Sequence, residues 1–300
     1  EQHYHGCTKS VKHIYTTEKY HNERMDLEIP LISGYSVEPA RMRSAEKLYH
    51  VISDLEVPDG DIAFIALDWG PNTRPENGPQ TEMVIEHLMR RRIKFALFST
   101  YVFAEPFLVS IPETIAQRLM QEQPGEAWEY GVDWVNLGYK PAARYVIQGI
   151  PKADNLIDLF VQDAFGTSLS QVPAFSKVRT IDDIRFLAQF TGLVGTFDMY
   201  VQFFQSETYR PKFGHGCTSI TIPEAYIYLD SGQIVGLLEG IAGAAWYSIL
   251  LSREFPLRAV DNTLSLNTGL GVAHLVILFL IVAGNLAFIW GRRSSERRVA

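Results

Sequence analysis

The two cysteines of the chain each end a His-Gly-Cys tripeptide, at Cys7 and Cys217. Thiols that face an oxidising compartment form a disulfide when the fold brings them together, and this is the preferred interpretation. Imidazole and thiolate groups also bind zinc or copper, so His5, Cys7, His215 and Cys217 form an alternative metal site. Their spacing is tighter than that of common zinc motifs, and unlinked cysteines are the third interpretation. We predict no other cofactor.

A second group of polar residues follows an apolar run, in the loop "DWGPNTRPENGP". Asp68, Asn72 and Thr73 could bind a polar ligand there, near the N-terminus of the next helix. The later turn "FTGLVGTFD" adds Thr191 and Asp198. Ligands of open α/β sheets bind beyond the carboxyl ends of the strands, where both loops are expected to lie. The competing interpretation is structural, with glycine and proline shaping rigid turns and Asp68 capping backbone amides.

Familiar catalytic patterns are missing from the sequence. It contains no G-x-G-x-x-G or G-x-x-x-x-G-K-[ST] phosphate loop, no G-x-S-x-G nucleophile elbow and no H-E-x-x-H metal motif. We therefore predict no catalytic residue and favour a protein that is not an enzyme. The net charge of −7 also argues against a nucleic-acid partner, which would need a basic surface.

An alternation of apolar strands and helices surrounds these loops. The predicted strands are 61–69, 93–100, 133–139, 143–149, 184–192 and 216–223, and the predicted helices are 38–55, 78–92, 111–123, 155–166 and 196–205. The first two strands are short continuous apolar runs, typical of strands buried on both faces. The pattern predicts an α/β fold with an open, mostly parallel, doubly wound, Rossmann-like sheet of about five or six strands.

Residues 224–252 are predicted to form one long helix, or two helices joined near residue 231. Gly232, Gly236, Gly240 and Gly243 would give this region a smooth surface on which another helix or the sheet packs closely. A charged residue near the middle, Glu239, makes a membrane span costly here. We therefore expect a helix packed on the sheet.

An apolar run of 21 residues without formal charge extends from Leu270 to Trp290. About 20 helical residues cross the hydrocarbon core of a bilayer, so we predict a transmembrane helix at 270–290 that contacts membrane lipid. Arginines concentrate after it, in "GRRSSERR", and an excess of basic residues marks the cytoplasmic side. The main domain is therefore expected in the periplasm or outside the cell. A signal peptide or a first membrane helix is expected before Glu1, because this orientation needs a translocation signal.

The predicted parts are a polar N-terminal stalk and helix (1–57), an extracytoplasmic α/β domain (58–255), a linker (256–269), the transmembrane helix (270–290) and a basic cytoplasmic tail (291–300). An outer α/β domain held by a terminal membrane helix resembles uncharacterised bacterial membrane-anchored proteins of the gliding/ABC-transport-auxiliary type. The resemblance covers architecture alone and implies no site residues.

The preferred functional hypothesis is a non-enzymatic accessory or structural subunit. Its α/β domain would dock on other membrane or periplasmic proteins of an envelope or transport complex. The alternative hypothesis is a small-molecule binder or hydrolase that uses the crevice at the carboxyl ends of the strands.

Overall fold

The computed structural model describes residues 36–259 and 261–299, with side chains as far as Trp290. This part of the chain divides into two units. One unit, Pro39–Thr263, is the α/β domain. The other holds the remaining described residues, most of them in one long terminal helix.

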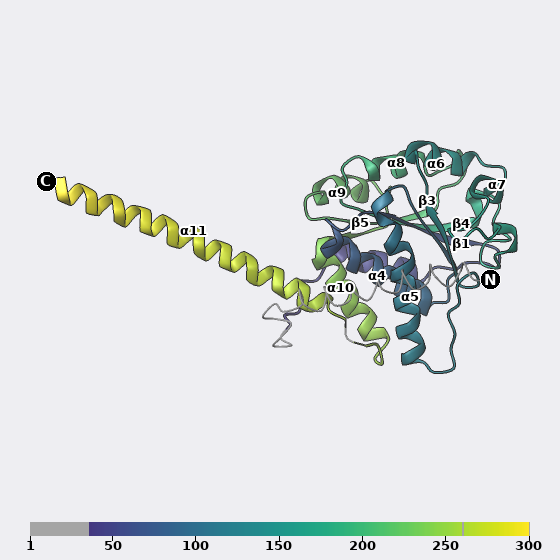
Figure 1. Ribbon diagram of the computed structural model, residues 1–300, viewed down its shortest axis with the longest axis horizontal. Helices are drawn as coiled ribbons and strands as arrows, with labels where there is room; N and C mark the ends of the chain where they lie inside the picture. Colours follow the sequence, from purple (N-terminus) through teal and green to yellow (C-terminus); the bar gives the residue numbers. More distant parts are fainter. Residues whose placement is uncertain (1–35, 260, 300) are drawn as a thin grey trace, which may run out of the picture. The chain divides into compact units, whose positions relative to one another are not determined.

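Six parallel strands form one sheet in the order β3-β2-β1-β4-β5-β6 (Figure 1). The strands are β1 (Ile62–Asp68), β2 (Phe95–Ser99), β3 (Trp134–Tyr139), β4 (Ile184–Thr191), β5 (Lys212–Cys217) and β6 (Gly236–Glu239). In this order the chain moves outward from β1 to β3 and then returns to start again at β4, which is the doubly wound arrangement. The predicted fold class is confirmed.

Helices cover both faces of the sheet. One face carries α3 (Arg43–Ser53), α4 (Arg74–Arg90), α5 (Glu105–Glu122) and α10 (Gly240–Glu254), and the other carries α6 (Ala143–Gly149), α7 (Leu156–Phe160), α8 (Thr196–Phe203) and α9 (Ile222–Asp230). Short 3₁₀ turns occupy Val102–Ala104, Ile150–Lys152, Leu169–Gln171 and Ile181–Asp183. Successive residues of β1 point to opposite faces, so Ile65 joins the first core and Phe64 the second.

Three elements in the second part of the chain differ from the prediction. Residues 143–149 form α6 rather than a strand, and the strand expected at 216–223 lies at 212–217 instead. The region 224–252 contains the end of α9, then β6, then α10, rather than one or two helices. Periodicity gives no boundary here, because β6 has only four residues and α10 begins at the residue that follows it.

The four glycines of the predicted helix-packing surface lie on different elements. Gly232 occupies a turn with φ of +74°, Gly236 lies in β6, and Gly240 and Gly243 lie in α10. Gly236 lets α3 lie directly on β6, because a Cβ there would be 2.5 Å from the backbone nitrogen of Leu48. The close contact at Gly236 is therefore between helix α3 and strand β6, and not between two helices.

The α/β domain extends beyond the predicted range of 58–255 at both ends. At its start, α3 packs on β6. At its end, the residues after α10 are held by a buried ion pair between Arg258 and Glu86 of α4. Residues 256–263 are therefore part of the domain rather than a free linker.

The terminal helix α11 (Thr263–Val299) contains one stretch, Thr263–Trp290, that is long and apolar enough to cross a membrane. Its apolar side chains from Leu270 to Trp290 are exposed. The two polar side chains of this exposed part bond within the helix: Asn285 Nδ2 donates to the Ile281 carbonyl, and His274 Nδ1 lies 2.8 Å from the Leu270 carbonyl oxygen. Polar groups in lipid need such internal partners.

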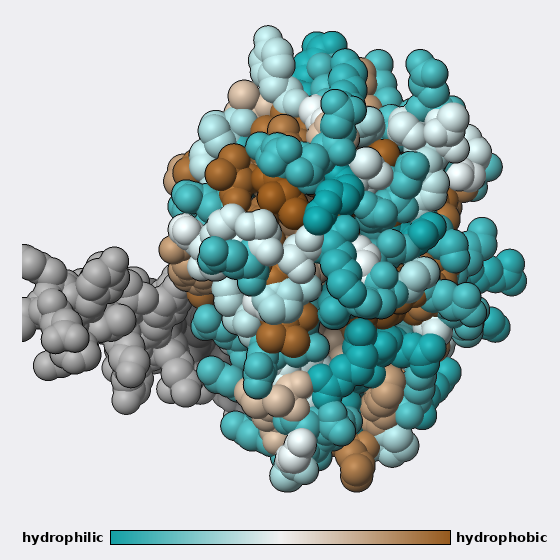
Figure 2. All heavy atoms as spheres, turned by 90° about the vertical axis from the view of Figure 1, so that its right-hand side faces the viewer, coloured by the Kyte–Doolittle hydropathy of each residue, from teal (hydrophilic) through white to brown (hydrophobic). Residues whose placement is uncertain are grey.

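The side of the domain that carries α7 shows apolar side chains among hydrophilic ones (Figure 2). Leu159, Val161 and Phe165 are exposed there. Val161 has a φ of +63°, and the Gln162 N–H donates to the Phe160 carbonyl at 2.7 Å, which defines a γ-turn. The turn holds the Val161 side chain at the surface.

Candidate functional site

The strand order places the switch point of the sheet between β1 and β4, where an α/β fold forms its ligand crevice. Asp68 and Thr191 end these two strands and are partners in the β1–β4 register. The Thr191 hydroxyl donates to the Asp68 carbonyl at 2.8 Å and accepts a hydrogen bond from the Leu193 N–H at 3.0 Å. The structure thus brings two of the predicted ligand-binding residues together, and Thr191 shapes the turn that follows β4.

The Asp68 carboxylate is fully buried and surrounded by donors. Its Oδ1 accepts hydrogen bonds from the Thr100 N–H at 2.7 Å and the Thr100 hydroxyl at 2.8 Å. Its Oδ2 accepts one from Gln189 Nε2 at 3.3 Å. Burial raises the pKa of Asp68, and these hydrogen bonds act in the opposite direction. The carboxylate therefore joins the carboxyl ends of β1 and β2 and does not face solvent.

Two buried polar atoms lie beside this carboxylate, the Tyr200 hydroxyl of α8 and Oε1 of Gln189. Tyr200 is buried, and the Asp68 charge, after burial itself, raises its pKa. Within the described residues, neither the Tyr200 hydroxyl nor Gln189 Oε1 makes a hydrogen bond. A buried polar group of this kind is unusual in a native structure.

His215 of β5 lies on the same face of the sheet and is neutral. Its Nδ1 lies 2.9 Å from the Gln189 carbonyl oxygen, and its ring stacks on Phe197 with the centroids 3.8 Å apart. Burial lowers the pKa of His215 to about 3, against the smaller opposing effect of the Gln189 carbonyl. The imidazole is therefore a packed, uncharged part of the core at neutral pH.

Thr73 fills the space above the switch point. A Cβ on Gly192 would lie 2.6 Å from Thr73 Cγ2 and 2.8 Å from Thr218 Cγ2, so these methyl groups close the crevice over the glycine. The Thr73 hydroxyl and Asn77 Oδ1 are buried, and neither has a hydrogen-bond partner among residues 36–259 and 261–290. The site is therefore closed by side chains but retains unused polar atoms.

The other two predicted ligand-binding residues lie elsewhere. Asn72 is exposed in the loop after β1. Asp198, in the first turn of α8, accepts a hydrogen bond from the Tyr228 hydroxyl of α9 at 2.7 Å. Burial and then the Asp198 charge raise the pKa of the neighbouring Glu224. Asp198 thus belongs to the contact between α8 and α9.

Cys217 ends β5 with a buried side chain, and burial raises the pKa of its thiol to about 12. His5 and Cys7 lie outside the described residues, so the predicted disulfide and the alternative metal set stay predictions. Within the described part of the chain, no group of three or more His, Cys, Asp or Glu side chains could hold a metal ion.

Sequence reasoning missed Gln80, which joins α4 to the ends of three elements. Its Nε2 donates to the carbonyls of Cys217 at 2.8 Å, Leu238 at 3.1 Å and Gly240 at 2.8 Å. Its Oε1 accepts from Asn77 Nδ2 at 3.0 Å. The only sequence signal is a group of polar residues on an otherwise apolar face of the helix at 77, 80 and 81.

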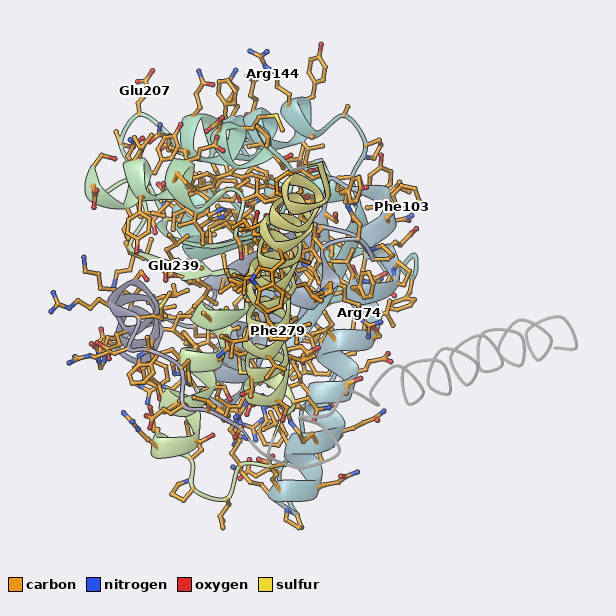
Figure 3. The ribbon with its side chains drawn as sticks, turned by 90° about the vertical axis from the view of Figure 1, so that its left-hand side faces the viewer. Arg74, Phe103, Arg144, Glu207, Glu239 and Phe279 are labelled. Atoms are coloured by element: carbon orange, nitrogen blue, oxygen red, sulfur yellow. The ribbon has the colours of Figure 1, made fainter. Side chains whose placement is uncertain are left out.

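The loops around the closed crevice expose large apolar side chains. We call residues 69–73, 100–104, 192–195 and 218–221, which follow β1, β2, β4 and β5, the edge loops. Phe103 is 60% exposed, Val194 77% and Ile220 86%. Figure 3 labels Phe103 and also Arg74, the first residue of α4. No protein-family model matches the chain, and comparisons with curated proteins and with solved structures gave no match.

Proposed function

We propose that the chain is a membrane-anchored, non-enzymatic accessory subunit. Its α/β domain would lie on the extracytoplasmic side and dock, through the edge loops, on a partner protein of an envelope or transport complex. The apolar stretch of α11 supports the anchor. The arginines that follow Trp290 support the orientation, because basic residues concentrate on the cytoplasmic side.

The observation that carries the proposal is the apolar surface of the edge loops. Phe103, Val194 and Ile220 come from three different loops, and each is more than half exposed. The loops touch one another: a Cβ on Gly70 would lie 3.1 Å from Phe103 Cβ, and the contacts of Gly192 link the loops after β1, β4 and β5. Exposed apolar side chains on loops that touch one another favour a protein interaction site at this edge of the sheet.

The closed crevice supports docking over catalysis. Most of the polar atoms of Asp68, Thr191 and Gln80 are already used in hydrogen bonds that hold strands and helices together. The Thr73 and Thr218 methyl groups fill the space in which a substrate would lie. A small substrate would have to displace this packing before it reached Asp68.

The charge beside the edge loops indicates the chemistry of the partner. Arg74 is exposed at the start of α4, and its guanidinium lies 5.4 Å from the centroid of the Phe107 ring. No ion pair joins Arg74 to a carboxylate of the described residues. We infer a partner surface that is apolar, with an acidic side chain opposite Arg74.

Site-specific photo-crosslinking in native membranes tests the proposal. p-Benzoylphenylalanine is placed at Phe103, Val194 or Ile220 in the full chain, and the matched control is Met120, an exposed apolar residue near the far end of α5. We expect one discrete crosslinked protein from the three edge-loop positions and none from Met120. Crosslinking that is absent, or equal at all four positions, would overturn the docking role.

Four unused buried atoms favour a second candidate, a small-molecule binder at the switch point. They belong to Thr73, Asn77, Gln189 and Tyr200. A ligand could satisfy them if the loops after β1 and β4 moved apart. A thermal-shift screen with polar metabolites tests this, with Thr73→Val as the variant that should abolish a shift. Asp68→Ala is unsuitable, because it would leave several buried donors without an acceptor.

A further inference from the structure

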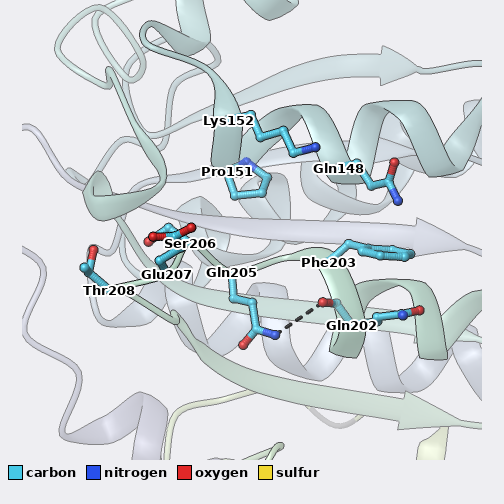
Figure 4. A pocket seen from close by; sticks show the side chains of 9 residues that line it. All are labelled: Gln148, Pro151, Lys152, Gln202, Phe203, Gln205, Ser206, Glu207 and Thr208. Atoms are coloured by element: carbon cyan, nitrogen blue, oxygen red, sulfur yellow. Dashed lines mark hydrogen bonds between the residues drawn. The ribbon is translucent and has the colours of Figure 1, made fainter.

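A cleft of about 540 Å³ lies between the end of α6 and the end of α8 (Figure 4). Its lining consists of Gln148, Pro151, Lys152, Gln202, Phe203, Gln205, Ser206, Glu207 and Thr208. Helix α8 starts at the carboxyl end of β4, and this cleft lies at its other end, so it opens at the amino edge of the sheet. The cleft is therefore separate from the switch point and from the edge loops.

We propose that this cleft binds a saccharide. Its volume is in the usual range for small-molecule sites, roughly 300–1,000 Å³. Three side-chain amides and two hydroxyls line it, and each of these groups both donates and accepts hydrogen bonds. Sugar hydroxyls have the same double capacity, so they match this lining better than a ligand that only accepts or only donates.

Many of these polar groups are unused. Gln148, Lys152, Gln202, Glu207 and Thr208 make no side-chain hydrogen bond or ion pair within the described part of the chain. Figure 4 shows these side chains arranged around the opening, with Phe203 between the two helices. They remain available to a ligand without breaking a contact inside the protein.

One aromatic ring gives the cleft an apolar surface. Phe203 is partly exposed, and the Arg144 guanidinium lies 5.3 Å from the centroid of its ring. A single ring beside amides suits a pyranose, which has an apolar C–H face and a polar rim.

The charges of the lining disfavour a free phosphate or a divalent cation. Lys152 and Glu207 carry opposite charges on the two sides of the cleft. A phosphate would meet the Glu207 carboxylate, and a divalent cation would meet one carboxylate and an ammonium group. A neutral, hydroxyl-rich ligand meets no such repulsion.

The loop after α8 is held in place before any ligand binds. Gln205 Oε1 accepts from Arg210 Nε at 2.6 Å, and its Nε2 donates to the Gln202 carbonyl at 3.2 Å. The Tyr209 N–H donates to the Ser206 hydroxyl at 2.9 Å, and the Tyr209 hydroxyl donates to the Ile184 carbonyl at 3.1 Å. A preformed site avoids the entropy cost of ordering a loop on binding.

Saturation-transfer difference NMR on the full chain in nanodiscs tests the proposal, with glucose, N-acetylglucosamine and maltose as probes. We expect at least one probe to bind, and the double variant Gln148→Ala/Gln202→Ala to weaken it at least about fivefold, since each lost hydrogen bond contributes about 1 kcal/mol. The matched control is Gln171→Ala, which removes an exposed amide outside the cleft.

Three outcomes would overturn the saccharide site. One is no signal above empty nanodiscs for any probe, and another is equal binding by the double variant and the Gln171→Ala control. The third is binding of a tri-serine peptide in place of all three sugars, which would assign the cleft to peptides. None of these outcomes depends on whether the edge loops bind a partner.

Discussion

Arg258 and Glu86 form a bidentate ion pair although 172 positions separate them, with Nε–Oε1 at 2.7 Å and Nη2–Oε2 at 2.9 Å. The side chains are 1% and 0% exposed. Glu86 also bonds to Arg90 of the same helix and to Arg118 of α5. Arg258 bonds in turn to Asp261, two residues before α11 begins. One carboxylate thus joins α4 and α5 to the segment that leads into α11.

Replacing Arg258 by Leu should destabilise the domain strongly. The change leaves the buried Asp261 without its guanidinium, and removing one partner of a buried pair costs about 3–5 kcal/mol. Urea unfolding of the full chain in detergent, followed by tryptophan fluorescence, measures the loss. The control is Arg41→Leu, which breaks the exposed pair with Glu46 and should change little. Equal effects of the two variants would show that the buried pair does not stabilise the domain.

The buried histidines should make the domain less stable below pH 6.5. Burial lowers the pKa of His215 and of His87 to about 3, and for His87 the nearby Arg91 and Arg90 add to this effect. The unfolded chain, with a pKa near 6.5, then binds more protons between about pH 3 and 6.5, so stability is complete above this window and is lost as the pH falls.

The variant His215→Gln tests this pH dependence. It should reduce the slope of the unfolding free energy against pH by about 1.4 kcal/mol per unit between pH 4 and 6, because one proton fewer is taken up on unfolding. Denaturant unfolding at several pH values gives the slope. His50→Gln, at an exposed position, controls for the loss of a ring. An unchanged slope in His215→Gln would mean that this imidazole is not neutral in the folded state.

Gly236→Ala should separate α3 from β6. The added Cβ would lie 2.5 Å from the Leu48 nitrogen and 2.6 Å from Leu48 Cα. These are backbone atoms, which cannot move aside as the end of a flexible side chain can. Overpacking of this kind costs about 1–3 kcal/mol. The loss is read from the thermal midpoint of the domain, and Gly271→Ala, in open space on α11, is the control. A Gly236→Ala protein as stable as the control would contradict the close contact.

The sheet could be predicted because its central strands have an unambiguous signal. β1 and β2 are continuous apolar runs bounded by polar turns, as expected in a parallel sheet covered on both faces. β6 could not be predicted, since four residues are too few to show a period of their own. Its position became evident only from the contact of Gly236 with α3, which depends on the fold.

The candidate site was predictable only where position alone defines it. Asp68 and Thr191 end neighbouring strands, so the rule for ligand crevices of α/β sheets finds both. Gln189 and Tyr200 were not predicted. A polar residue inside an apolar strand or helix shows no pattern that distinguishes a core position from a ligand-binding position. The Arg258–Glu86 ion pair was not predicted for a different reason, since nothing in the sequence links residues so far apart.

Cysteine labelling should establish on which side of the membrane the domain lies. In a Cys7→Ser background Cys217 is the remaining cysteine, and its burial should protect it from reagents. Single cysteines are then introduced as Ser231→Cys, at an exposed turn of the domain, or Ser295→Cys, among the arginines near the end of α11. The positive charge of this tail should keep it in the cytoplasm. A membrane-impermeant maleimide added to cells with a permeabilised outer layer should therefore label Ser231→Cys at once and Ser295→Cys only after lysis. The reverse pattern would place the domain in the cytoplasm, where a Cys7–Cys217 disulfide is not expected to persist.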